Sequence, residues 1–180
     1  RPGPPSRRRV LARLLYRNLI ALTPTLGEQQ EMFDHPAPEA FDELVDQLLD
    51  RQGYGERWGR HWLDLVRYAE TNGYERDAVK PRVWRYRDYV IRSFNNDKPY
   101  DQFVREQIAG DELDAESIEN RIAVGFLRMG PWEQTGMAVA RLTRPQFLDD
   151  VPAAVVQVFL GHSLQCARVH APKFAPLPTP

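Results

Sequence analysis

The 180-residue sequence predicts an all-α protein, and three observations lead to that prediction. Apolar residues recur with the period of an amphipathic helix along most of the chain. No stretch of useful length alternates polar and apolar residues as a half-buried strand does. Turn residues separate the periodic stretches, and prolines are spaced through the C-terminal end. We therefore expect one domain, a compact irregular array of helices that ends in a Pro-rich extended tail.

The first helix is expected to open with residues 7–17 and to end at residues 23–25, and the second is expected over residues 38–51. Ser6 is the expected N-cap of the first helix, and Pro24 lies at its end. Pro38 suits the first turn of the second helix, and residues 52–55 are expected to break it. The two apolar faces comprise Leu11, Leu14, Leu15 and Leu19 in the first helix, and Phe41, Leu44, Val45, Leu48 and Leu49 in the second.

The next helices, over residues 56–69 and 83–95, are expected to supply the aromatic part of the core. In the first of them, the expected inward face contains Trp58, His61, Trp62, Leu65 and Ala69. Residues 71–73 form the turn between the two helices. A single apolar core is predicted to contain Trp58, Trp62, Leu65, Tyr86, Val90 and Phe159.

Three further helices are expected over residues 99–108, 117–127 and 147–164. His162 falls on the apolar face of the last of these helices. The prolines that follow it forbid regular structure. The first residues do not form a signal peptide, so an exported form of the protein is expected to have lost its leader.

Composition narrows the class of protein. The 24 Lys and Arg residues nearly balance the 25 Asp and Glu residues, which argues against a general binder of nucleic acid or anionic membranes. No apolar run approaches the ~20 residues that span a membrane. The basic and aromatic run at residues 84–89 could stack nucleobases, but a packed amphipathic helix is the favoured interpretation. One cysteine excludes an internal disulfide.

The residues Cys166 and His170 form a C-x-x-x-H motif. Covalent haem attachment normally uses C-x-x-C-H, and here Val169 stands at the second Cys position. Taken alone, the motif favours a buried free cysteine and a surface histidine. His162, Cys166 and His170 are spaced by four and could hold zinc, although Pro172 and the missing fourth ligand argue against that.

His61, which lies between two tryptophans in the sequence, is a second candidate for a functional residue. It could be a metal ligand or a general base tuned by nearby carboxylates, and the favoured alternative is a core histidine. The carboxylates of Glu70, Glu75 and Asp77 beside Asn72 could also bind a hard cation. Their alternative is a solvated turn paired with basic residues, namely Arg67, Arg76 and Lys80.

Several long and unusual stretches occur in order along the chain: Tyr54–Asp64, Arg67–Glu75, Trp84–Val90, Asn96–Gln107, Gly110–Leu113 and Gly125–Leu127. Together, over about residues 8–177, the chain resembles a domain of unknown function found in planctomycete cytochrome-c-type proteins. In those proteins the domain lies between a haem-binding module and a second uncharacterised domain. The resemblance implies that the 180 residues are a piece or a relative of a longer multidomain chain.

The resemblance extends without a gap into residues 160–176. The family usually reads Cys-Ala-Arg-Cys-His-Asp-His-Lys-Phe-Asp-Pro where this chain has Cys-Ala-Arg-Val-His-Ala-Pro-Lys-Phe-Ala-Pro. The resemblance implies covalent haem c in this segment, with Cys166 as a thioether position and His170 as an axial iron ligand. His162 or His61 would be the second axial ligand.

Val169, Ala171, Pro172 and Ala175 depart from that pattern, and each replaces a potential ligand or a group that supports one. Three interpretations are open. The domain could have kept its fold and lost haem, or could hold haem through a single thioether. Alternatively, position 169 is Cys in the native gene and the motif is intact.

Three functions are compatible with these observations. The first is a haem-bearing electron-transfer or accessory domain of an exported, periplasmic assembly, with other protein subunits or redox partners. The second is a haem-free scaffold subunit of a larger complex. The third is a hydrolytic or carbohydrate-active domain using His61, Asp64 and Glu70. We rank it last and favour a non-enzymatic role, because no nucleophile–base pair or carboxylate pair has diagnostic spacing.

Overall fold

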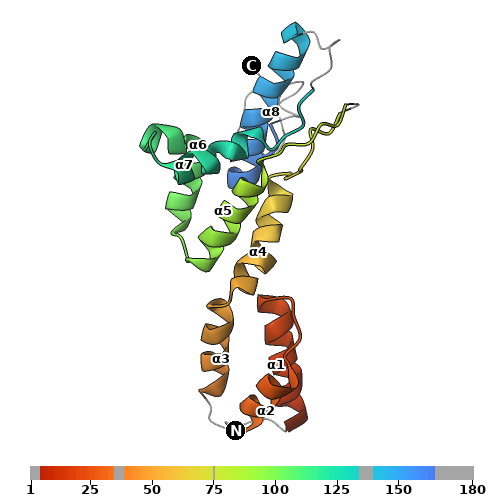
Figure 1. Cartoon of the computed structure of the whole chain (residues 1–180), viewed down its shortest axis with the longest axis vertical. Coiled ribbons are helices and arrows are strands. Elements are labelled where there is room, and N and C mark those ends of the chain that lie inside the picture. The colour runs from red at the N-terminus through yellow and green to blue at the C-terminus, as the bar shows by residue number, and fades with distance from the viewer. Residues whose placement is uncertain (1–4, 35–38, 75, 134–139, 165–180) are drawn as a thin grey trace. The chain divides into compact units, whose positions relative to one another are not determined.

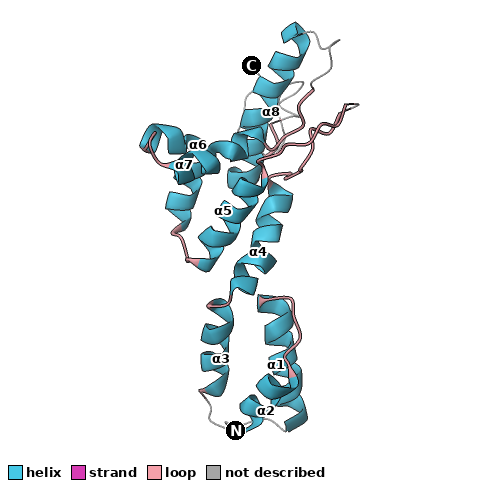
Figure 2. Cartoon of the chain, viewed as in Figure 1, coloured by secondary structure: helices cyan, strands magenta, loops and turns pink. Residues whose placement is uncertain are grey.

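The computed structural model describes residues 5–34, 39–74, 76–133 and 140–164. Within these ranges the chain is helical and contains no strand, apart from an isolated antiparallel bridge between Thr71 and Val79 (Figures 1 and 2). The predicted all-α class is therefore confirmed. The Pro-rich tail lies outside the described residues.

The longest connection between helices, residues 66–83, separates the fourth helix from the fifth. In order the helices are α1 (Pro5–Leu19), α2 (Leu26–Asp34), α3 (Ala40–Leu49), α4 (Gln52–Leu65), α5 (Trp84–Asn95), α6 (Tyr100–Leu113), α7 (Ile118–Ala123), the 3₁₀ helix η1 (Val124–Arg128) and α8 (Ala140–Leu160).

The contacts divide the chain into two compact units. The first unit contains residues 1–61 and 90–98, and the second contains residues 62–89 and 99–180. Helices α4 and α5 each contribute residues to both units. The expectation of a single folding domain stays a prediction.

The first unit has a small core between α1 and α3. Its buried residues are Ala12, Tyr16, Ile20, Leu44 and Leu48. On α1 they recur every four residues, so they share one helix face. Leu15 and Leu19 pack against this core as predicted. Leu11 and Leu14 do not, because they lie on the opposite side of α1 and are 43% and 45% exposed.

Helix α2 was not predicted, although it carries a capping box. The Thr25 hydroxyl oxygen accepts a hydrogen bond from the Glu28 N–H (3.3 Å), and the Glu28 carboxylate accepts one from the Thr25 N–H (2.7 Å). This reciprocal pair satisfies N–H groups that a helix start otherwise leaves open. Pro24 therefore precedes a new helix after the end of α1.

Aromatic rings build the core of the second unit. The Trp62 ring centroid lies 4.9 Å from that of Phe103 and 5.7 Å from that of Phe159. Phe126 also packs on Phe159, at 5.2 Å between centroids. Tyr86 is buried as well, so Trp62, Tyr86 and Phe159 form a core as predicted.

Much of the predicted inward face of α4 was wrong. Trp58 is 38% exposed, Leu65 is 56% exposed and Ala69 is exposed. The buried face of α4 in the first unit carries Gly55 and Gly59 instead. A Cβ on Gly59 would lie 3.4 Å from Val90, and the Gly55 N–H donates to Asn95 Oδ1 at 2.7 Å. Val90 is buried as predicted, but it belongs to this first unit.

Several predicted boundaries also shifted. Residues 52–55, expected to break a helix, form the first turn of α4, and Ser6 lies inside α1 rather than at its N-cap. Helix α6 continues to Leu113 through a non-helical Ala109 (φ −144°). Helix α8 begins at Ala140 and ends at Leu160, with Pro145 and Pro152 inside it.

Candidate functional site

The candidate haem segment, residues 160–176, begins at the end of α8. Gly161 has φ +66°, a left-handed conformation that glycine adopts without steric cost and that commonly ends helices. The next residue, His162, is partly buried and its N–H donates to the Val156 carbonyl at 3.3 Å. His162 therefore follows the helix, whereas the sequence pattern placed it on a helix face.

The two residues that would hold haem, Cys166 and His170, lie outside the described residues, as does Val169. The proposed zinc triad of His162, Cys166 and His170 falls partly on the same segment. The predicted roles of Cys166 and His170 therefore stay predictions.

His61 is not a core histidine, which corrects the favoured interpretation. Its side chain is exposed, and its ring lies 5.5 Å from that of Trp58 within the first unit. Helix α4 is thus rotated about its axis relative to the predicted orientation. The side that carries Trp58 and His61, predicted to face the core, is exposed instead.

The two described carboxylates beside the 71–73 turn, Asp77 and Glu70, each have a partner. Asp77 accepts the Gly73 N–H at 2.6 Å, which lowers the pKa of the Asp77 carboxyl, and Gly73 has φ +77°. Glu70 accepts the Tyr68 hydroxyl at 3.1 Å and lies 3.4 Å from Arg87. Glu75 is not described, and among the described residues no group of three His, Cys, Asp or Glu residues could hold a metal.

Arg67 was expected to pair with the turn carboxylates, but among the described residues it contacts another acidic residue. Its guanidinium binds the Asp150 carboxylate of α8 through two contacts, at 2.8 and 2.9 Å. Bidentate pairs of this kind fix orientation as well as charge. The ion pair therefore links the residues that follow α4 to α8 within the second unit.

Beside this ion pair the second unit has a pocket of about 270 Å³. Aromatic and acidic side chains line most of it: Tyr74, Pro131, Trp132, Glu133, Thr143, Gln146, Phe147, Asp149 and Asp150. It contains none of the residues proposed for hydrolytic chemistry. His61 belongs to the first unit, whereas Asp64 and Glu70 belong to the second.

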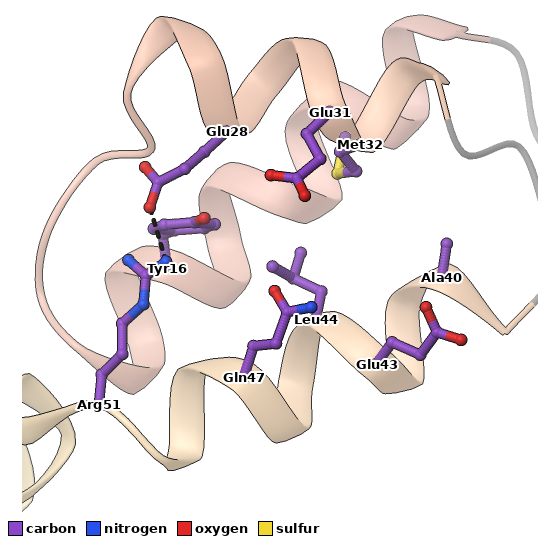
Figure 3. A pocket seen from close by; sticks show the side chains of 9 residues that line it. All are labelled: Tyr16, Glu28, Glu31, Met32, Ala40, Glu43, Leu44, Gln47 and Arg51. Carbon is purple, nitrogen blue, oxygen red and sulfur yellow. Dashed lines mark ion pairs between the residues drawn. The ribbon is translucent and has the colours of Figure 1, made fainter.

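A smaller pocket of about 80 Å³ lies in the first unit (Figure 3). There Arg51 is 2.7 Å from the Glu28 carboxylate, and its guanidinium lies 5.4 Å from the Tyr16 ring centroid. Burial alone would raise the pKa of Glu28, but hydrogen bonds from Thr25 and Arg51 lower it to about 2. Burial, followed by the charge of Glu28, raises the pKa of Tyr16.

A buried polar network in the second unit was not predicted. The Gln107 side-chain carbonyl accepts hydrogen bonds from Trp62 Nε1 (3.0 Å) and from the Tyr86 hydroxyl (2.5 Å). The Gln107 amide donates to the Phe103 carbonyl at 3.1 Å. Burial raises the pKa of Tyr86, a shift that the Trp62 hydrogen bond opposes only in part. Tyr86 therefore stays a neutral hydrogen-bond donor. The buried polar groups of this network have hydrogen-bond partners, as is usual in a structural core.

None of the described helices is long and apolar enough to cross a membrane. Searches of curated proteins and of solved structures gave no match. One comparison was positive: residues 1–180 match PSCyt2, described as a protein of unknown function (DUF1549). That match covers the whole chain and agrees with the predicted resemblance to a domain of unknown function. The chain thus belongs to the PSCyt2 (DUF1549) family.

Proposed function

We propose that this chain is a c-type haem-bearing domain that serves electron transfer, or an accessory role, in an exported protein assembly. The observation that carries the proposal is the Cys166-Ala-Arg-Val-His170 sequence. It keeps the separation between the first Cys and the His of C-x-x-C-H. It also keeps the order of the family's C-terminal residues.

The donor chemistry of the segment fits a haem with one covalent link. The Cys166 thiol can add across a haem vinyl group: a sulfur–carbon bond forms, the thiol proton goes to the other vinyl carbon, and no electrons are transferred. The His170 imidazole is a common axial ligand of haem iron. Val169 has no sulfur, so the second vinyl group would remain unsubstituted.

The bound haem would supply one-electron redox chemistry, and the protein would tune it through ligation and burial. For the second axial ligand we favour His162, because it is partly buried and follows α8 four residues before Cys166. His61 is the alternative. It is exposed and packs on Trp58 in the first unit.

The test is expression of the chain with an added export signal in a bacterium that attaches c-type haem. We expect a Soret band that acid-acetone extraction does not remove, and a pyridine haemochrome α-band displaced from that of a two-thioether haem. Cys166→Ala should make the haem extractable, and His170→Ala should change the ligand-field spectrum while the helical circular dichroism persists.

Matched histidine variants complete the design. His162→Ala should alter the spin state of the iron, whereas His61→Ala should leave the spectrum unchanged. Absence of any haem from a folded, exported chain would overturn the proposal and leave the scaffold function. Fractionation of the native organism tests the compartment, because covalent haem attachment outside the cytoplasm requires a periplasmic or otherwise exported protein.

A further inference from the structure

The near-neutral net charge hides a strong separation of charge in the first unit. Residues 1–27 contain six arginines and no Asp or Glu. Residues 28–50 contain eight Asp and Glu residues and no Lys or Arg. The basic segment contains α1, and the acidic segment contains α3 and all of α2 except its first two residues. Opposite charges are thus presented by different helices of one small unit.

On α1 the basic residues form a regular stripe. Arg9, Arg13 and Arg17 follow one another at intervals of four residues, and all three are exposed. Side chains at that spacing lie on one side of a helix, about 6 Å apart along its axis. Two apolar side chains adjoin the stripe: Val10 is 56% exposed and Leu14 is 45% exposed. We call these five residues the arginine stripe.

Helix α3 presents the complementary pattern. Asp42, Asp46 and Asp50 also follow at intervals of four, and all three are exposed. Asp50 is the C-cap and keeps helical angles (φ −74°, ψ −8°), so it stays in register with the other two. Leu49, beside them, is 36% exposed. We call these four residues the aspartate stripe.

The aspartate stripe is unfavourable for the isolated unit. Like charges four residues apart on a helix repel each other and weaken it slightly. Within the part of the chain that the structure describes, no ion pair offsets the charge of Asp42, Asp46 or Asp50. Glu28, by contrast, is neutralised directly by an ion pair with Arg51.

We propose that the arginine stripe docks on the aspartate stripe of a second copy of this chain. Both stripes advance by the same distance per charged residue, so three arginines meet three aspartates in one register. In this contact, Val10 and Leu14 of one copy also pack against Leu49 of the other. An anionic membrane is a poorer occupant of the arginine stripe, because the acidic helices of the same unit would be repelled by it. This inference is independent of haem.

The test measures the mass of the intact chain by analytical ultracentrifugation under reducing conditions, so that Cys166 forms no intermolecular disulfide. We expect wild-type association at low ionic strength that weakens at least about tenfold in 0.5 M salt, as exposed ion pairs are screened. Arg13→Glu with Arg17→Glu should give a monomer, as should Asp42→Arg with Asp46→Arg. An equimolar mixture of the two variants should associate again, because each then presents a complementary stripe.

The control is Arg82→Glu with Arg121→Glu, which changes the net charge equally at exposed positions of the second unit. It should associate like the wild type. The milder pair Arg13→Gln with Arg17→Gln should weaken association even if charge reversal disturbs folding. A wild type that stays monomeric at low salt, or a mixture of folded variants that fails to associate, would overturn the proposal. Binding of a monomeric wild type to phosphatidylglycerol vesicles would also overturn it, in favour of a membrane partner.

Discussion

Replacing Trp62 by alanine should destabilise the second unit strongly. The side chain is 92% buried, since its relative exposure is 8%, and its ring packs against Phe103 and Phe159. Removing a buried tryptophan typically costs about 3–5 kcal/mol of the free energy of unfolding. The lost hydrogen bond adds little, because the Gln107 carbonyl still accepts the Tyr86 hydroxyl. For a chain of this size the loss corresponds to a fall in Tm of roughly 6–20 °C.

The matched control is Trp58→Ala on the same helix, four residues earlier. Trp58 is 38% exposed and contacts the rings of Tyr54 and His61, so we expect a loss below about 1 kcal/mol. Urea unfolding followed by circular dichroism compares the two variants directly. Equal losses would contradict the exposed position of Trp58 and would restore the prediction that both tryptophans are core residues.

Two further predictions test local contacts. Gly110→Ala should destabilise the protein by about 1–3 kcal/mol, because the added Cβ would lie 2.6 Å from the Asn120 carbonyl oxygen. The control is Gly27→Ala, which should cause no steric strain because the space around Gly27 is open. Thermal unfolding compares the two variants. Glu28 has a pKa lowered to about 2, so its stabilising contribution is complete above about pH 4.5 and is lost as the pH falls through 2. Glu28→Gln should therefore flatten the acid side of the stability–pH curve, and an unchanged curve would contradict the stabilising role of the Thr25 and Arg51 contacts.

Periodicity was sufficient for much of the helical architecture. The prediction of a helix over residues 83–95 differs from α5 by one residue at its start. Leu44 and Leu48 are buried, as the apolar stripe of α3 indicated. These elements succeed because large apolar side chains carry their packing faces, and large side chains are what a periodicity search detects.

Helix α4 shows where that reasoning fails. Gly55 and Gly59 allow α5 to approach closely, so the packed face of α4 in the first unit is made by residues without side chains. A search for hydrophobic residues assigns that face to Trp58 instead. The information was present in the spacing of Gly55 and Gly59, four residues apart, but Gly55 was interpreted as part of a break at residues 52–55.

The two other omissions have different causes. The start of helix α2 has a capping-box signal in the sequence, Thr25 and Glu28 three residues apart, so a search for capping boxes would have found it. The role of Gln107 had no local signal. Its partners Trp62 and Tyr86 lie 45 and 21 residues away in the sequence, and only the folded chain brings a polar side chain to them.

The two proposals concern separate parts of the chain, and this separation makes each one testable without the other. The arginine and aspartate stripes belong to the first unit, whereas Cys166 and His170 follow the last helix of the second. A charge reversal at Arg13 changes no haem donor, and Cys166→Ala changes no charge in either stripe. Loss of association with an intact haem spectrum would therefore identify the stripes as a docking surface. Loss of haem with unchanged association would identify the C-x-x-x-H segment as the cofactor site.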